Sequence, residues 1–282
     1  PRDDGGDMTA TPTASGVGSA PADRASPGWL VVLRQELRDL WLGGRGFVLI
    51  FAFSLLVGII AYLVATNTDL NFLEQRESTS LTLQVAIAIG GMLTLLVAAD
   101  AVSGERERGT LETLLLSPVS RRALTGGKQL AAISLWLAAF AVTVPYVWFL
   151  GHGVGIVDEA LVAGLAVGTL LAVFLSSLGI LVSCFAASNR VSISLSLFVL
   201  LAFLAPTQLP AGAQQAWAGD LLLRVNPLTA GERYVSKIVV SGHSWTEDIS
   251  WLLSPVIGSV VFAMAAVLVG GRYIRLRGGV SG

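Results

Sequence analysis

Charged residues are scarce in this chain. Only 13% of its 282 residues are Asp, Glu, Lys or Arg, whereas 54% are hydrophobic. A soluble domain carries about a quarter charged residues, so this composition is typical of a protein that lies in lipid. The formal net charge of -1 also lacks the basic excess that binding to nucleic acid requires, and we expect no nucleic-acid partner.

Side chains that carry out chemistry are equally rare. The single cysteine, Cys184, excludes an internal disulfide and a cysteine-based metal cluster. The two histidines, His152 and His243, fall in separate predicted loops beside glycines, where a solvated side chain is commoner than a catalytic or metal pair. The stretch Gly126–Gln129 lacks the upstream glycine and the hydroxyl residue of a phosphate-binding loop. We therefore expect a non-catalytic chain that binds no cofactor, no metal and no ATP of its own.

Six apolar runs divide the chain. Each is close to the ~20 residues with which a helix crosses ~30 Å of hydrocarbon, and helix is expected because backbone groups in lipid must pair within their own segment. The runs are Phe47–Ala65, Leu81–Ala99, Leu130–Leu150, Ala160–Cys184, Val191–Leu209 and Trp251–Gly270. The sequence thus predicts an all-α integral membrane protein with six transmembrane helices.

Ionisable side chains are absent from the interior of all six runs. Ion-coupled transporters keep such groups at mid-membrane depth, so transport by this chain would need an external energy source. The polar side chains of the runs are uncharged, which favours lipid-like, amphiphilic or drug-like cargo over small ions. In the fourth run, Gly164 and Gly168 have the spacing that lets helices approach closely, although 31 glycines also produce this spacing by chance.

Two segments precede the first run. Residues 1–27 are rich in small residues and proline and cannot bury enough apolar surface to offset their ordering entropy, so we predict a disordered tail. From Trp29 to Leu42, apolar residues recur at helical spacing with charges between them. This pattern predicts an amphipathic helix in the membrane interface, ended by Gly43-Gly44. Residues 28–275 would then form one membrane domain, followed by a short tail, 276–282.

Positive charge gives the orientation. With both termini in the cytoplasm, the inner segments hold 14 Lys and Arg residues and the outer loops hold 4. This asymmetry predicts a multi-pass protein of the cytoplasmic membrane with both termini inside. The last outer loop, 210–250, is long and contains two apolar patches that are too short to span, Leu221–Leu223 and Ile238–Val240. These patches fit either surface or re-entrant half-helices or an ordinary structured loop.

A charged, leucine-rich connection, residues 103–129, joins the second and third runs. Its charged cluster ends at Gly109-Thr110, which can start a helix because a threonine oxygen accepts from free amides of the next turn. Leu111, Leu114 and Leu115 would share one face of that helix. Ser117-Pro118 would end it, and Ser120 can cap the helix that leads into the third run. A plain charged connector is the alternative, but it does not require three leucines facing water.

The connection also carries a family resemblance. The residues concerned are Glu105-Arg106-Glu107-Arg108-Gly109-Thr110-Leu111-Glu112, the stretch from Leu114 to Arg121, and Gly127-Lys128. They resemble the signature of type-2 ABC exporter permeases, particularly the branch that includes the permease of nitrous-oxide-reductase maturation. The six-span layout, the helix before the first span and the long last outer loop extend the resemblance over about residues 28–275.

The resemblance implies a cytoplasmic coupling helix that docks on a separate ATPase subunit, and a pathway formed by two permease halves, identical or different. The residues it assigns to ATPase coupling are Glu105, Glu107, Arg108, Gly109, Thr110, Leu111, Glu112, Leu114, Leu115 and Pro118. We therefore expect the permease subunit of an ATP-driven exporter, with an ABC ATPase, a second permease half and the lipid bilayer as partners. The alternative is a membrane anchor that recruits a cytoplasmic partner without transport.

Overall fold

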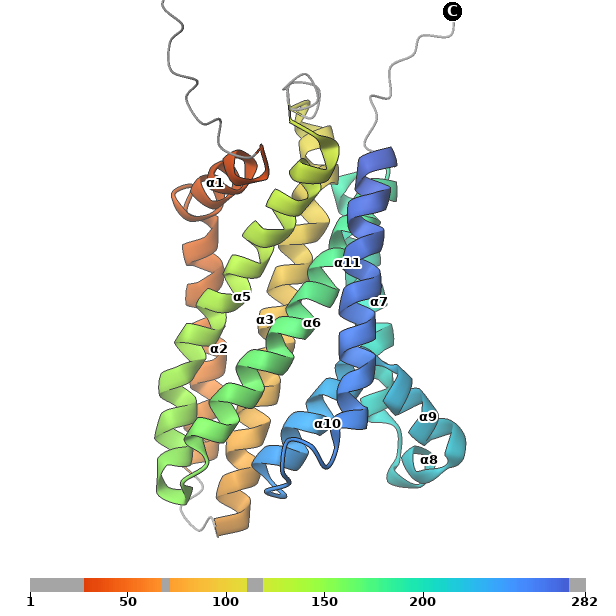
Figure 1. Ribbon diagram of the computed structural model, residues 1–282. Helices are drawn as coiled ribbons and strands as arrows, with labels where there is room; N and C mark the ends of the chain where they lie inside the picture. Colours follow the sequence, from red (N-terminus) through yellow and green to blue (C-terminus); the bar gives the residue numbers. More distant parts are fainter. Residues whose placement is uncertain (1–27, 67–71, 111–118, 274–282) are drawn as a thin grey trace, which may run out of the picture.

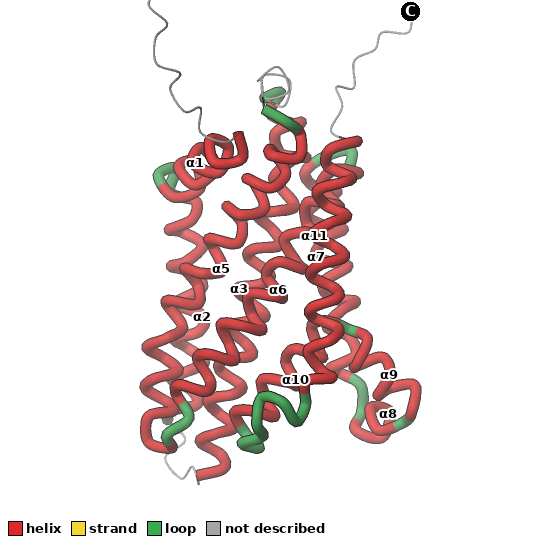
Figure 2. The backbone as a smooth tube through the Cα atoms, viewed as in Figure 1, coloured by secondary structure: helices red, strands yellow, loops and turns green. Residues whose placement is uncertain are grey.

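The structure, a computed structural model, describes residues 28–66, 72–110 and 119–273. Within these ranges it consists of helices joined by turns and short loops, without strands (Figure 1, Figure 2). Six helices are long and apolar enough to cross a bilayer, as predicted. They are α2 Arg45–Ala65, α3 Phe72–Arg108, α5 Arg121–Gly151, α6 Val157–Phe185, α7 Asn189–Leu204 and α11 Leu253–Tyr273. The predicted tails, 1–27 and 276–282, lie outside the described residues.

The six long helices are enclosed to different degrees. In the most apolar window, 61% of the residues of α3 and of α6 are buried, against 17% in α2 and in α11. α3, α5 and α6 form the centre of the bundle, with α2 on one side and α7 and α11 on the other (Figure 1). The outer helices expose large apolar side chains such as Phe51, Phe198 and Met264, which suits faces that contact lipid.

Two glycines let α6 lie close to its neighbours. A Cβ added at Gly164 would lie 2.7 Å from a methyl group of Leu83 on α3. One added at Gly168 would lie 2.1 Å from the ring of Trp136 on α5, whose Nε1 donates to Thr169 on α6. The small-residue spacing in the fourth run therefore has a packing role in this bundle.

The helix α1 Gly28–Trp41 lies across one end of the bundle, which we call the α1 end (Figure 1). It stops where the sequence predicts, because Gly44 has φ 80° and a Cβ at Gly43 would lie 2.2 Å from the carbonyl oxygen of Asp39. Val32 and Leu40 are its buried side chains. That α1 lies in a membrane interface stays a prediction.

Three shorter helices cover the opposite end, which we call the α10 end: α8 Ala211–Gln215, α9 Trp217–Val225 and α10 Pro227–Val239. α10 packs against α3, α6 and α11 and buries Leu228, Tyr234 and Val235. Between α9 and α10, the Asn226 side chain accepts from the Leu228 amide at 3.0 Å and so caps α10. Of the two alternatives for residues 210–250, the structure has the short helices.

Candidate functional site

The last two turns of α3 carry the densest group of charges among the described residues. Glu105, Arg106, Glu107 and Arg108 follow each other there, one turn after Asp100. The apolar run ends at Ala99, but the helix continues to Arg108 because these side chains find partners on neighbouring elements. They form the polar part of the α1 end.

Lys128 is the centre of this group. It lies in the second turn of α5 and only 2% of its side chain is exposed. Its ammonium nitrogen lies 2.6 Å from a carboxylate oxygen of Glu36 on α1 and 2.5 Å from one of Glu105 on α3. A buried ammonium is costly unless it is paired, and here one cation holds two carboxylates from two other helices.

A second ion-paired group surrounds Asp100, whose side chain is 10% exposed. Its Oδ2 lies 3.1 Å from a guanidinium nitrogen of Arg45 on α2 and 3.4 Å from one of Arg108. Gly104 makes room for this arrangement, since a Cβ there would lie 2.1 Å from Asp100 Oδ1 and 2.8 Å from Arg108 Nη2. The glycine at the head of the charged stretch is therefore required by the ion pair beside it.

The other two charges of the stretch contact helix ends. Arg106 donates to the carbonyl oxygens of Ala186, at 2.5 Å, and Cys184, at 3.3 Å, where α6 ends. Glu107 accepts from the backbone amide of Asn189, the first residue of α7, at 3.2 Å. A cation at a helix C-terminus and an anion at an N-terminus satisfy free backbone groups and suit the helix dipole.

The connection between α3 and α5 has a defined start and a defined finish. Gly109 has φ 72°, the Gly109 amide donates to the Arg106 carbonyl at 3.3 Å, and the Thr110 amide donates to the Glu105 carbonyl at 3.1 Å. This is the glycine-based ending of a helix. The predicted helix after Gly109-Thr110 lies outside the described residues and stays a prediction. Ser120 does cap the next helix as predicted, accepting from the Ala123 amide at 3.2 Å.

Close packing brings α1 to the cluster. A Cβ at Gly127 would lie 2.7 Å from a methyl group of Val32 and 3.1 Å from the amide nitrogen of Leu33. Only glycine lets α1 approach α5 so closely, and Glu36, one turn after Val32, then reaches Lys128. Trp41 adds a second link between these helices by donating from Nε1 to Ser134 Oγ at 3.2 Å.

We call these ion-paired residues at the α1 end, with Lys128 and Asp100 at their centres, the charged cluster. The charged cluster connects neighbouring helices to one another. Through it the end of α3 is joined to α1, α2, α5 and the turn between α6 and α7. Among the described residues, no three His, Cys, Asp or Glu side chains are placed to hold a metal ion. Ion pairs of this kind fix the relative positions of the elements that carry them.

Residues 30–271 match the family described as ABC-2 family transporter protein. The chain belongs to the ABC-2 transporter family. A search of curated proteins finds no match to it. Family membership and the six long apolar helices make it a multi-pass membrane protein and the membrane component of an ABC transporter.

In this ABC-2 permease the predicted coupling residues divide into two groups. Glu105 pairs with Lys128, and Arg108 pairs with Asp100. Glu107 is exposed and contacts α7. Gly109 and Thr110 form the end of α3. The remaining five lie outside the described residues: Leu111, Glu112, Leu114, Leu115 and Pro118. The described group therefore surrounds the point where the connection leaves α3.

Sequence reasoning did not find the partners of the charged stretch. In the sequence, Lys128 is part of the stretch that resembles the exporter signature, and Glu36 is one of the charges between Trp29 and Leu42. Neither pattern predicts that the two side chains pair. A usable signal exists for Lys128, because the residues three or four positions away, Leu124, Ala131 and Ala132, are apolar and share its helix face. A single charge on such a face must meet an opposite charge from another helix.

Proposed function

We propose that this chain is one half of an ATP-driven exporter and that its α1 end faces the cytoplasm. A separate ABC ATPase subunit would dock on the connection between Gly109 and Ser120. Family membership supports the transporter role, and the excess of Lys and Arg in the segments at the α1 end supports the orientation. The direction of transport follows the resemblance of residues 105–121 to the branch with the nitrous-oxide-reductase maturation permease.

The observation that best supports a coupling role is that the charged cluster lies at both ends of the connection between α3 and α5. α3 ends three residues after Glu105 and α5 begins seven residues before Lys128, and these two residues form an ion pair. A displacement of the connection by the ATPase therefore acts on α3 and α5 together. Glu36 adds α1 to the same moving unit.

The proposed transporter contains two such halves, identical or different. α2, α7 and α11 expose apolar faces along their length, and a second half would cover part of this surface. The leucine-rich residues 111–115 would supply the apolar centre of the ATPase interface, and Glu107 its polar margin, since interface centres are apolar and rims polar.

The test uses the chain purified from its native membranes through an affinity tag. A phosphate-loop ATPase should be recovered with it, in a complex whose mass requires two permease chains. Inverted membrane vesicles that contain the complex should then take up its substrate, and this uptake should depend on ATP hydrolysis. Recovery of the ATPase without any ATP-dependent movement would favour the anchor, and an active complex with one permease copy would contradict the two-half arrangement.

A further inference from the structure

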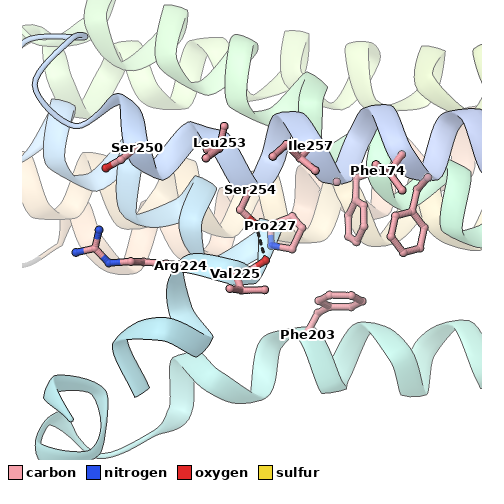
Figure 3. A pocket seen from close by; sticks show the side chains of 12 residues that line it. Phe174, Phe203, Arg224, Val225, Pro227, Ser250, Leu253, Ser254 and Ile257 are labelled. Carbon is pink, nitrogen blue, oxygen red and sulfur yellow. Dashed lines mark hydrogen bonds between the residues drawn. The ribbon is translucent and has the colours of Figure 1, made fainter. Parts of the chain in front are cut away.

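A cavity of about 550 Å³ opens at the α10 end, between α7 and α11 (Figure 3). This volume lies in the range of about 300–1,000 Å³ that is typical of small-molecule sites. Phe203 on α7 lies across the cavity from Ile257 on α11, and Phe174 on α6 lies beside Ile257, at the end away from Arg224. Val225, the last residue of α9, and Pro227, the first residue of α10, also line the cavity.

Aromatic rings form the deep part of the cavity. The ring of Phe174 contacts those of Phe203 and Phe262 edge to face, with centroids 5.3 and 5.0 Å apart. On the open side, Leu253, Ile257 and Val261 are 61%, 52% and 49% exposed on the outer face of α11. The cavity therefore opens sideways, toward lipid, and a hydrocarbon chain can enter it from the bilayer.

One cationic side chain, Arg224, lines the opposite end of the cavity. Figure 3 shows the Arg224 side chain at the end away from Phe174. Its guanidinium lies 4.7 Å from the centre of the Trp251 ring, and Arg233 and Lys237 lie 5.5 and 5.4 Å from the same ring. Trp251 itself is 5% exposed.

Arg224 is the cation that lines this cavity, and its carboxylate partner occupies only one of its nitrogens. Asp220 accepts from Arg224 Nε at 2.8 Å, and Asp248 pairs with Lys237 and His243. Arg233 donates to the neutral side chain of Gln214, and both line a different cavity together with Glu232. Within the described residues, the terminal amino groups of Arg224 make no hydrogen bond, so they are available to an anion.

We infer that this cavity binds a single-chain anionic amphiphile, with its hydrocarbon chain against the three phenylalanines and its headgroup at Arg224. The apolar body, the sideways opening and the cationic end each match one part of such a molecule. A transmembrane helix of a second copy does not fit the cavity of about 550 Å³, because a helix about 10–12 Å across with a pitch of about 5.4 Å fills roughly 500 Å³ with a single turn. The site stands without the proposed function, and only the description of its ligand as cargo rests on that function.

The experiment uses the full chain in nanodiscs of neutral phosphatidylcholine, without ATPase. The probes are a photoreactive long-chain alkyl phosphate and the alcohol of the same chain length. The phosphate should label peptides of α7 and α11, and the alcohol should label them about tenfold less, as expected for the loss of one charge-assisted hydrogen bond. Arg224→Gln should remove this preference for the phosphate.

Two neighbouring residues give a matched control for the apolar part. Val261 lines the cavity and Val260 does not, although both lie on α11 and are about equally exposed, 49% and 51%. Val261→Trp should abolish labelling and Val260→Trp should retain it. Equal labelling in both variants, or equal labelling by phosphate and alcohol in the unmodified chain, would overturn the inference.

Two further outcomes separate this inference from others. Disulfide crosslinking between two copies through Val261→Cys would make the cavity part of a subunit interface and would overturn it. If the variants change labelling as expected but the protein shows no ATP-dependent transport, the site is supported and the proposed function is contradicted. If the protein transports but the alkyl phosphate does not label the cavity, the proposed function is supported and the site is contradicted.

Discussion

At the α1 end Lys128 is 2% exposed and contacts two carboxylates, whereas at the α10 end Lys237 is 34% exposed and Glu232 faces a cavity of about 200 Å³ without a hydrogen bond to any described residue. The first end uses charge to tie helices together, and the second leaves charge available beside open space. A transporter needs both kinds of region. Under the proposed function the first passes on a displacement, and under the further inference the second accepts a ligand.

The largest loss of folding stability should follow from removing the buried cation Lys128. Lys128→Met would leave Glu36 and Glu105 without their partner, and breaking a buried pair in this way costs about 3–5 kcal/mol. Titration of the folded chain with denaturing detergent in mixed micelles measures the loss. Adding Glu105→Gln to Lys128→Met should recover part of it, because one unpaired carboxylate is then neutral.

Lys237→Met is the matched variant at the other end. Lys237 contacts Asp248 and is half-solvated, so the loss should be clearly smaller. If both lysine variants lose the same stability, the contrast between the two ends is wrong.

Two adjacent glycines of α5, Gly126 and Gly127, test how closely α1 packs on α5. Gly127→Ala places a methyl group 2.7 Å from Val32 and should cost about 1–3 kcal/mol, because α1 must move away. Gly126→Ala meets nothing within 4 Å and should stabilise α5 by about 0.5–1 kcal/mol. The same detergent titration compares them, and a loss in both would show that α1 does not hold the position described.

The effect that depends on pH lies at the α10 end. Burial raises the pKa of Glu232 to about 7, from an ordinary value of 4.5. The folded chain therefore holds this proton more tightly than the unfolded chain, and stability falls as pH rises from about 4.5 to about 7. Glu232→Gln removes this fall, so the variant should be more stable than the unmodified chain at pH 8 and nearly equal to it at pH 5.

Gly126→Ala is the control for that comparison, because it changes no titratable group and its effect should be the same at both pH values. A Glu232→Gln difference that does not change between pH 5 and pH 8, or that is larger at pH 5, would contradict the raised pKa.

The six spans were predictable from the sequence because an apolar run of bilayer length has one regular solution in lipid. Local signals also sufficed for the glycine ending of α1 and the Ser120 cap of α5. Each of these depends on residues close together in the chain. That is why a pattern in one segment predicted them.

The charged cluster was not predictable in the same way. Glu36, Glu105 and Lys128 are brought together by the close approach of α1 to α5 at Gly127, which a single sequence does not encode as a local pattern. The same applies to the end of α3: Gly109 stops a helix that continues because its charges pair with other elements. Tertiary contacts, not periodicity, decide both features.

Binding of the ATPase to Leu111→Asp, with ATP-dependent uptake into inverted vesicles assayed beside it, shows most directly whether the ATPase acts on the connection between α3 and α5. A charge in the apolar centre of the interface should weaken binding by about tenfold or more and abolish uptake, while membrane insertion stays normal. Glu107→Gln, at the margin, should have a smaller effect. Normal binding and normal uptake by Leu111→Asp would contradict the assignment of the connection between Gly109 and Ser120 as the place where the ATPase acts.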